Sequence, residues 1–397
     1  MQIKEVLIKD VKLGMCLAND TTNNKNEVIY RKGFYFTSRE QIIRLLDEGV
    51  KSILVNITAS LIDMRSSKQI EQSQEFVKKE NEALYKQVDE LDAEQEKVID
   101  LYQSSQNVIN DLMNNARFGK ALNLDVVQKQ TIDVLNSIRK NELALLSLIN
   151  LKNFDEYTYT HSLNVSILSA AFAWNLKFPE DQLISIGRGA FFHDIGKAKV
   201  PLSIVNKPGA LSESEKRIMQ MHPSYGEQIY NQEIITNEIE RGIVTQHHES
   251  FDGSGYPHSL EGNRISKYAS IVSISDFFDA LTTVRSYRPE VHPSEVIQII
   301  YSLSAKKFDP RVVNHFIKTI GIYPIGSLVE LSNDQIAIVK AFSKENLLKP
   351  IVELLKVENG YLASQNKIVS LMESEVYVKS VYKGEGKLVE KNIMKKL

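Results

Sequence analysis

FFHDIGK, Phe191 to Lys197, sets a histidine and an aspartate side by side toward the C-terminal end of an apolar helical segment. One imidazole and one carboxylate then reach the same cavity, and a carboxylate with two oxygens can bridge two cations. Lys197 follows His193 by four residues, about one helical turn, where its ammonium group could approach a metal-bound phosphate. Taken alone, the His-Asp pair could equally be a hydrogen-bonded feature of the core, so a metal site needs further ligands.

Further candidate ligands lie on both sides of this stretch. His161 follows a helix start near Asp155, and Asp276 lies in an apolar run where an unpaired carboxylate would be costly. We expect one cation site from His161, His193, Asp194 and Asp276, and a second cation held across Asp194 by His222, His247 and His248. Sites rich in imidazole suit iron, manganese, nickel or zinc better than magnesium.

Several motifs, read in chain order, resemble the HD-GYP phosphodiesterases, a branch of the HD superfamily. The motifs between residues 193 and 289 are HDIGK, KPGALSESE, MHPSYGEQI, HHE, DGSGYP and SDFFDALTTVRSYRP. The resemblance covers about residues 126 to 316. The first 57 residues also resemble a module found ahead of this domain, and GIYPIGSLVEL from Gly321 resembles its trailing segment.

This resemblance implies hydrolysis of cyclic di-GMP to linear pGpG, with GMP as a further product, through a hydroxide that bridges two metal ions. The implied ions are iron or manganese, with nickel or zinc as alternatives. The implied metal ligands are His161, His193, Asp194, His222, His247, His248 and Asp276. The implied catalytic residues are Asp194, Lys197, Asp252 and Asp279, and the implied substrate-binding residues are Lys197, Gly255, Tyr256, Pro257, Arg285 and Arg288.

One position departs from part of the family. Some members carry a glutamate four residues before the first histidine, and this glutamate joins a third metal. Here the position is Tyr157, whose phenol stays neutral at neutral pH because its reference pKa is about 10. We therefore expect two metals.

Two other functions remain open from the sequence. The domain could be a catalytically silent cyclic-dinucleotide sensor, although a sensor does not need a complete ligand set. It could also hydrolyse a mixed cyclic GMP-AMP dinucleotide, because base recognition depends on pocket geometry that the sequence does not reveal. Turnover of each substrate would discriminate among these functions.

The chain is expected to be mainly α, with four parts. Residues 1–57 predict a small α+β module, and 58–125 a helical linker, with a coiled coil as one form of it. Residues 126–318 predict an all-helical HD-type, metal-dependent catalytic domain, and 319–397 a short β-rich segment. The linker carries apolar residues at heptad spacing, at Val77, Leu84, Val88, Leu91, Val98, Tyr102, Ile109 and Leu112. This spacing favours a homodimer through the long helix, with a solvated helix or disordered linker as the alternative.

Composition limits the remaining options. The formal net charge of −2 gives no general attraction for a nucleic-acid polymer, so a phosphate ligand must be attracted locally. The single cysteine excludes an intramolecular disulfide and fits a reducing compartment. No apolar run is long enough to span a membrane, since a span needs about 18 residues or more. We therefore expect a cytoplasmic protein.

Overall fold

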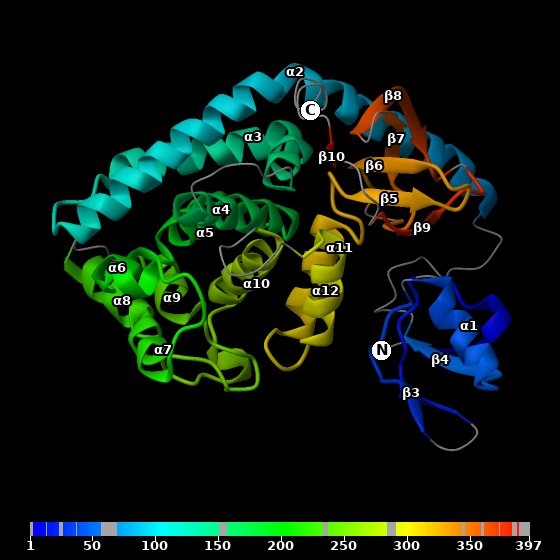
Figure 1. Cartoon of the computed structure of the whole chain (residues 1–397), viewed down its shortest axis with the longest axis horizontal. Helices are drawn as coiled ribbons and strands as arrows, with labels where there is room; N and C mark the ends of the chain where they lie inside the picture. The colour runs from blue at the N-terminus through cyan, green and yellow to red at the C-terminus, as the bar shows by residue number, and fades with distance from the viewer. Residues whose placement is uncertain are drawn as a thin grey trace. The chain divides into compact units, whose positions relative to one another are not determined.

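The computed structural model describes residues 3–12, 14–23, 27–36, 38–56, 70–150, 157–232, 237–283, 291–343, 346–358, 361–372, 374–382 and 387–388. The chain forms two compact units (Figure 1). One contains Met1–Asp89 with Gly321–Lys396, and the other contains Glu90–Ile320. Within the described residues, no helix is both long and apolar enough to cross a lipid bilayer.

The N-terminal part of the first unit mixes short strands with one helix. Strands β1 and β4 pair antiparallel, with Val6 opposite Ile53. Helix α1 starts after Ser38, whose backbone N–H donates to the Gln41 side chain, a typical helix start. The elements are β1 (Ile3–Leu7), the 3-10 helix η1 (Ile8–Asp10), β2 (Thr21–Thr22), β3 (Val28–Tyr30), α1 (Arg39–Asp47) and β4 (Ser52–Asn56).

The C-terminal part of the first unit is a six-stranded sheet in the order β10-β8-β7-β6-β5-β9. Neighbouring strands are antiparallel except β10, which runs parallel to β8. Val329, Ala337 and Val352 are buried in adjacent strands and form part of its core. The strands are β5 (Leu328–Leu331), β6 (Ile336–Ala341), β7 (Ile351–Glu358), β8 (Tyr361–Ser370), β9 (Val378–Val381) and β10 (Lys387–Leu388).

The second unit is helical. Its α-helices are the C-terminal part of α2 (Ile70–Arg117), then α3 (Leu124–Asn150), α4 (Tyr157–Asn175), α5 (Glu180–Phe192), α6 (Leu202–Val205), α7 (Glu213–Met219), α8 (His222–Gln232), α9 (Glu238–Gln246), α10 (Lys267–Thr282), α11 (Pro293–Ser302) and α12 (Pro310–Ile320). The 3-10 helices η3 (Ile195–Lys199) and η4 (Gly262–Arg264) complete it. The mainly α fold with α+β and β-rich parts at its ends is therefore confirmed.

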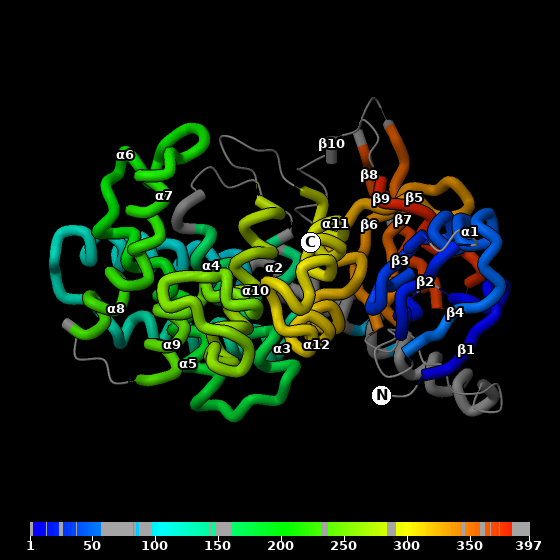
Figure 2. Tube along the Cα trace, turned by 90° about the horizontal axis from the view of Figure 1, so that it is seen from below, coloured from blue at the N-terminus to red at the C-terminus, as the bar shows by residue number. Residues whose placement is uncertain are grey.

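Helix α4 is the centre of the helical unit. Its residues are buried without interruption from Thr160 to Ala173. Helices α3, α5, α10 and α12 pack around it (Figures 1 and 2). A helix that is apolar on all sides belongs in the interior, where it removes the most apolar surface from water. His161 therefore lies deep in the unit.

The long helix α2 contributes to the core of the same unit. The seam residues Val98, Tyr102, Ile109 and Leu112 are all buried within this chain. The Tyr102 hydroxyl donates to Asn164 Oδ1 of α4, at 2.7 Å. These four residues are therefore used inside the chain rather than between two chains. The side chains of the other seam residues, Val77, Leu84, Val88 and Leu91, lie outside the described part.

Candidate metal centre

Six of the seven predicted ligands lie at or near helix ends that meet in the helical unit. His193 and Asp194 follow the last residue of α5, His222 is the first residue of α8, and His247 and His248 follow α9. His161 lies near the start of α4, and Asp276 lies within α10. Because helix ends bring side chains from different segments to one point, residues far apart in the sequence converge here.

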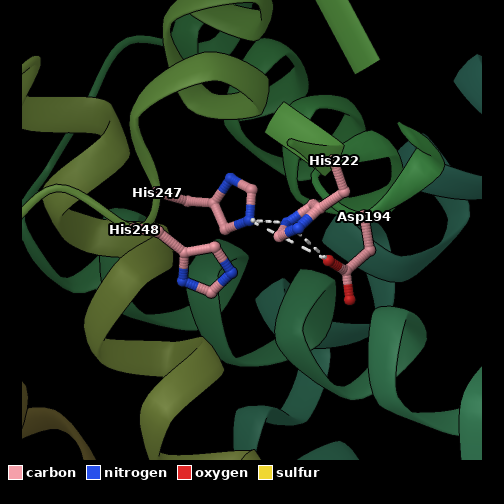
Figure 3. A group of neighbouring side chains, drawn as sticks. All are labelled: Asp194, His222, His247 and His248. Atoms are coloured by element: carbon pink, nitrogen blue, oxygen red, sulfur yellow. Dashed lines mark hydrogen bonds and ion pairs between the residues drawn. The ribbon is translucent and has the colours of Figure 1, made fainter. Parts of the chain in front are cut away.

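The ligands form two clusters, each compact enough to hold a metal ion. The first cluster is His161, His193 and Asp276, and the second cluster is Asp194, His222, His247 and His248. Within each cluster, one donor atom per residue lies within 4.8 Å of all the others. Figure 3 shows the second cluster, with His247 and His248 facing His222 and Asp194.

Asp194 lies between the two clusters. Its Oδ1 is 3.3 Å from His222 Nε2 and 3.9 Å from His247 Nε2, both in the second cluster. Its Oδ2 is 3.4 Å from His193 Nε2 and 3.8 Å from His161 Nε2, both in the first cluster. The two oxygens of one carboxylate thus face different clusters.

The histidine tautomers direct lone pairs into the site. Nδ1 of His193 is 2.7 Å from Ala190 O, and Nδ1 of His222 is 2.7 Å from Met219 O. Nδ1 of His247 likewise faces the carbonyls of Ile243 and Val244 at 3.1 Å. Since a carbonyl only accepts, each Nδ1 carries the proton of the neutral ring. Nε2 is then an unprotonated acceptor.

These unprotonated nitrogens fit a cation. Nε2 of His222 and Nε2 of His247 are 3.2 Å apart, and without a proton between them their lone pairs repel. His193 Nε2 and Asp194 Oδ1 are buried and make no hydrogen bond within the described residues. Buried polar atoms are costly when they lack a partner. Divalent ions coordinated by imidazole and carboxylate groups would satisfy all of these atoms.

Lys197 is placed differently from the expectation. The α-helix ends at Phe192, and η3 begins at Ile195, so Lys197 does not lie on one continuous α-helix with His193. Its ammonium group contacts Asp194 Oδ2 instead. Burial raises the pKa of Asp194, but Lys197, His193 and His222 outweigh it and hold this pKa well below its usual range. The carboxylate is therefore ionised.

Glycines allow the ligand-bearing segments to pack closely. A Cβ on Gly196 would collide with the His222 carbonyl and with the Gly226 backbone. A Cβ on Gly226 would lie 2.7 Å from Val244 Cγ1, and one on Gly189 would lie 2.6 Å from Ile243 Cδ1. The η3 segment and α8 therefore meet backbone to backbone, and α9 packs its side chains directly against α5 and α8, which brings Asp194 close to the second-cluster histidines.

The first cluster has a buried carboxylate behind it. Asp279 is fully buried, and its Oδ2 lies 2.8 Å from His161 Nδ1. On the other side of the ring, His161 Nε2 lies 3.1 Å from Asp276 Oδ1. Burial lowers the pKa of His161, but the bonds with Asp276 and Asp279 outweigh it and raise this pKa to about 9. Asp279 thus fixes the ring orientation.

The pKa values of the second-cluster histidines lie far below that of His161. Burial is the main cause, and it lowers the pKa of His222 to about 4 and that of His247 to about 3. Burial and the neighbouring His247 and His222 hold the pKa of His248 well below its ordinary value. These three rings are therefore neutral at neutral pH and ready to bind a cation.

The two clusters should respond differently to pH. A cation at the first cluster must displace the proton that His161 holds below pH about 9, so its affinity should rise about tenfold per pH unit up to that value. At the second cluster the affinity should stay nearly flat between about pH 5 and 8, because its histidines are already neutral. Mn²⁺ calorimetry at several pH values, in buffers of different ionisation enthalpy, measures both slopes. Equal slopes for the two ions would contradict the assigned protonation states.

The DGSGYP loop folds back over the second cluster. The Tyr256 ring lies 4.8 Å from the His248 ring, centroid to centroid, and its backbone N–H donates to His248 O. Gly255 has no room for a side chain, because a Cβ would meet Glu249 Cα at 2.5 Å. Pro257 follows a cis peptide bond. The exposed Asp252 accepts from Ser254 N and Oγ, at 3.0 and 2.6 Å, and so supports the loop rather than either cluster.

Glu249 is a residue that the sequence analysis did not assign to the site. Its side chain is buried next to His248. Oε1 accepts from His258 N at 2.7 Å, and Oε2 accepts from Leu260 N at 2.9 Å. The glutamate in HHE was the only signal for it. One carboxylate thus holds the far side of the loop that carries Tyr256.

Removing that carboxylate should release the loop. Glu249→Ala leaves two partly buried backbone N–H groups without their acceptor, at a cost of about 1 to 2 kcal/mol for each donor. We expect a stability loss of about 2 to 4 kcal/mol by urea unfolding and a higher KM for a cyclic dinucleotide, with metal content unchanged. Glu249→Gln keeps one acceptor oxygen, so its stability and its KM should lie between those of wild type and Glu249→Ala. An unchanged KM in Glu249→Ala would show that the loop does not depend on this side chain.

Some predicted residues cannot be placed. Arg285 and Arg288 lie outside the described residues, as does the expected helix start at Asp155. The backbone of Tyr157 begins α4, but its side chain is not described.

Comparison with known proteins agrees with this picture. Residues 144–312 match the family model described as HD domain, and residues 3–127 match one described as a domain of unknown function (DUF3391). Residues 144–312 therefore belong to the HD-domain family, and the predicted resemblance to the HD superfamily is confirmed.

Curated relatives are named as phosphodiesterases. A cyclic di-GMP phosphodiesterase of Pseudomonas aeruginosa is 32% identical over 66% of this chain and 63% of its own length. A cyclic di-GMP phosphodiesterase response regulator of Xanthomonas campestris is 30% identical over 48% of this chain and 52% of its own. A 3'3'-cGAMP-specific phosphodiesterase of Vibrio cholerae is 33% identical over 42% of this chain and 36% of its own length. The chain thus spans less than two thirds of each relative.

Proposed function

We propose that this chain is a metal-dependent phosphodiesterase that hydrolyses cyclic di-GMP to linear pGpG, with GMP as a further product. The observation that carries the proposal is Asp194, whose two oxygens face two separate clusters of buried ligands. Paired metal sites that share a ligand suit attack on a phosphodiester. The names of the Pseudomonas and Xanthomonas relatives support the choice of substrate.

The proposed first ion binds His161, His193 and Asp276, and the second binds His222, His247 and His248, with Asp194 shared. Iron or manganese is the proposed metal, with nickel or zinc as alternatives, because the donor set is rich in imidazole. When bound, two such ions would supply a bridging hydroxide as nucleophile and would neutralise charge on the phosphate.

The remaining residues are proposed to bind and orient the substrate. Lys197, whose ammonium group contacts Asp194 Oδ2 here, is proposed to donate to a phosphate oxygen, as the family resemblance implies. Gly255, Tyr256 and Pro257 would form one wall above His248. Arg285 and Arg288 are proposed to contact phosphate or guanine edges, as the family resemblance implies. Asp252 supports the loop and Asp279 orients His161.

A mixed cyclic GMP-AMP substrate is the second candidate, because the Vibrio relative is named for that specificity. The test is to incubate manganese-loaded protein with each dinucleotide and to resolve the products by chromatography. We expect turnover of cyclic di-GMP to exceed that of the mixed dinucleotide. The reverse order would establish the second candidate. Binding without turnover of either would identify a catalytically silent sensor.

The metal count is a further prediction. Because Tyr157 replaces a charged glutamate, the site should saturate at two ions per chain. Elemental analysis of protein made in iron- and manganese-rich medium measures the count, and anomalous scattering places each ion. Tyr157→Glu tests whether a carboxylate at this position recruits a third ion. Three full sites in the unaltered chain would require a ligand outside the proposed set.

The organisation of the whole chain is also proposed. We assign residues 126–318 to the catalytic domain, 1–57 to an N-terminal module, 58–125 to the linker and 319–397 to the C-terminal segment. We propose a homodimer through the long helix, which would use Val77 to Leu91 of the seam because the later seam residues are buried within the chain. The proposed location is the cytoplasm, in keeping with a single cysteine and no disulfide.

A further inference from the structure

Glu240 is a buried acidic side chain that the proposed reaction does not use. It lies on α9, seven residues before His247, and its side chain is fully buried. Its Oε2 accepts a hydrogen bond from the Tyr230 hydroxyl of α8. Its Oε1 pairs with Arg188 Nε of α5 at 3.3 Å. One carboxylate therefore connects three helices.

Those three helices supply all four residues of the second cluster. Helix α5 leads into Asp194, α8 begins at His222, and α9 leads into His247 and His248. Apolar contacts also join these helices, because Ile243 and Val244 of α9 lie against Gly189 of α5 and Gly226 of α8. Apolar contacts fill space without fixing direction, whereas the hydrogen bond from Tyr230 requires a particular geometry and the ion pair with Arg188 adds a second point of attachment.

Additional bonds hold the same end of α9. Asn237 caps the helix by accepting from Ile239 N and Glu240 N, at 3.0 and 3.2 Å. Its Nδ2 donates to Ser185 Oγ of α5 at 2.9 Å. Arg188 is itself held, because its guanidinium donates to Gln128 Oε1 of α3 at 3.0 Å. The N-terminal end of α9 is thus fixed against α5 and α8.

A small tilt of α9 about its N-terminal end would displace the ligands that follow its C-terminal end. Glu240 and His247 are about 10 Å apart along a helix, so a tilt of about 3° moves the histidine by about 0.5 Å. Functional groups need to be held within about 0.5 Å of their working geometry. A buried ion pair contributes little net stability, so stability is a weak reason for Glu240 to be there.

We propose that Glu240 is a positioning residue for the second cluster, and that its hydrogen bond from Tyr230 and its ion pair with Arg188 fix α9 so that His247 and His248 face Asp194. The inference rests on the proposed metal centre. It assigns the buried Glu240–Tyr230–Arg188 group to metal affinity rather than to folding alone.

The test compares Mn²⁺ binding to full-length wild type, Glu240→Ala, Glu240→Gln and Tyr230→Phe by calorimetry, with anomalous scattering to place the ions. Glu240→Ala should weaken the second-cluster ion by at least about tenfold and leave the first-cluster ion unchanged. Glu240→Gln should recover part of the affinity, because its amide oxygen still accepts from Tyr230. Tyr230→Phe should give a smaller loss, because it keeps the Arg188 pair.

The matched control is Gln130→Leu, which removes another buried bond between helices. Gln130 of α3 donates to Ser105 Oγ of α2 at 2.7 Å, and neither helix carries a ligand. It should alter stability without altering affinity for either ion. If wild type and Glu240→Ala bound the second-cluster ion equally well, the positioning role of Glu240 would be overturned and the metal centre would stand. Wild type with no ion at the second cluster would overturn the metal centre and this inference together.

Discussion

Asp194→Ala should abolish hydrolysis of cyclic dinucleotides and lower the metal content. The carboxylate faces both clusters, so its loss removes a ligand from each and the one group that connects them. A catalytic metal contributes several kcal/mol, and about 1.4 kcal/mol is a factor of ten. We therefore expect at least about a thousandfold loss of turnover. Product chromatography and elemental analysis of the same sample measure the two effects.

Asp181→Ala on the same helix is the control for that variant. Asp181 is an exposed carboxylate in the first turn of α5, far along the helix from Asp194. It should keep normal activity and normal metal content. If Asp194→Ala retained activity with both ions bound, the shared-ligand assignment would be wrong.

Gly196→Ala should unfold or empty the site although it adds only a methyl group. The new Cβ would collide with the His222 carbonyl and the Gly226 backbone, and backbone cannot move aside as a side chain can. Overpacking typically costs 1 to 3 kcal/mol, and we expect about 3 kcal/mol or more here because helix α8 must shift as a whole. His222 moves with it. Urea unfolding and metal analysis measure the two consequences.

Gly242→Ala provides the comparison for Gly196→Ala. A Cβ at Gly242 would meet Ser266 Oγ at 3.4 Å and Ser266 Cβ at 3.5 Å, which are ordinary contacts, and the position is within α9. Alanine in a helix interior is favoured over glycine by about 1 kcal/mol, so this variant should be as stable as wild type or more so. If Gly196→Ala behaved in the same way, the close approach of α8 to η3 would not be needed for the site.

The sequence was most informative where one residue type carries the chemistry. Adjacent His193 and Asp194, the pair His247 and His248, and the buried Asp276 pointed to ligands, and the structure brings all of them together. Helix and strand positions also followed from periodicity and from start signals such as Ser38. These features depend on local sequence, so they can be read without knowing the fold.

Features that depend on contacts between distant segments could not be read in this way. Glu240 and Arg188 are 52 positions apart, and nothing in either local sequence indicates the partner. Glu249 holds backbone N–H groups, which every residue except proline carries and which therefore leave no pattern. The direction of each Asp194 oxygen likewise depends on how four helices meet.

The seam on α2 shows why a periodic pattern leaves its partner undefined. Heptad spacing indicates that one face of a helix is covered, whether by a second chain or by the same chain. For Val98, Ile109 and Leu112 the cover is the chain itself. The pattern was correct, and the partner had to come from the structure.

The burial of α2 also bears on how the catalytic part could be isolated. The match to the HD family begins at residue 144, yet the buried face of α2 lies between Val98 and Leu112. Fully burying such side chains is worth about 1.5 to 3 kcal/mol each, so four of them approach the entire stability of a typical domain, about 5 to 15 kcal/mol. A fragment trimmed to the family limits would expose the apolar surface that α2 covers and would tend to aggregate. A fragment that starts before residue 90 would retain this part of α2 and keep that surface buried.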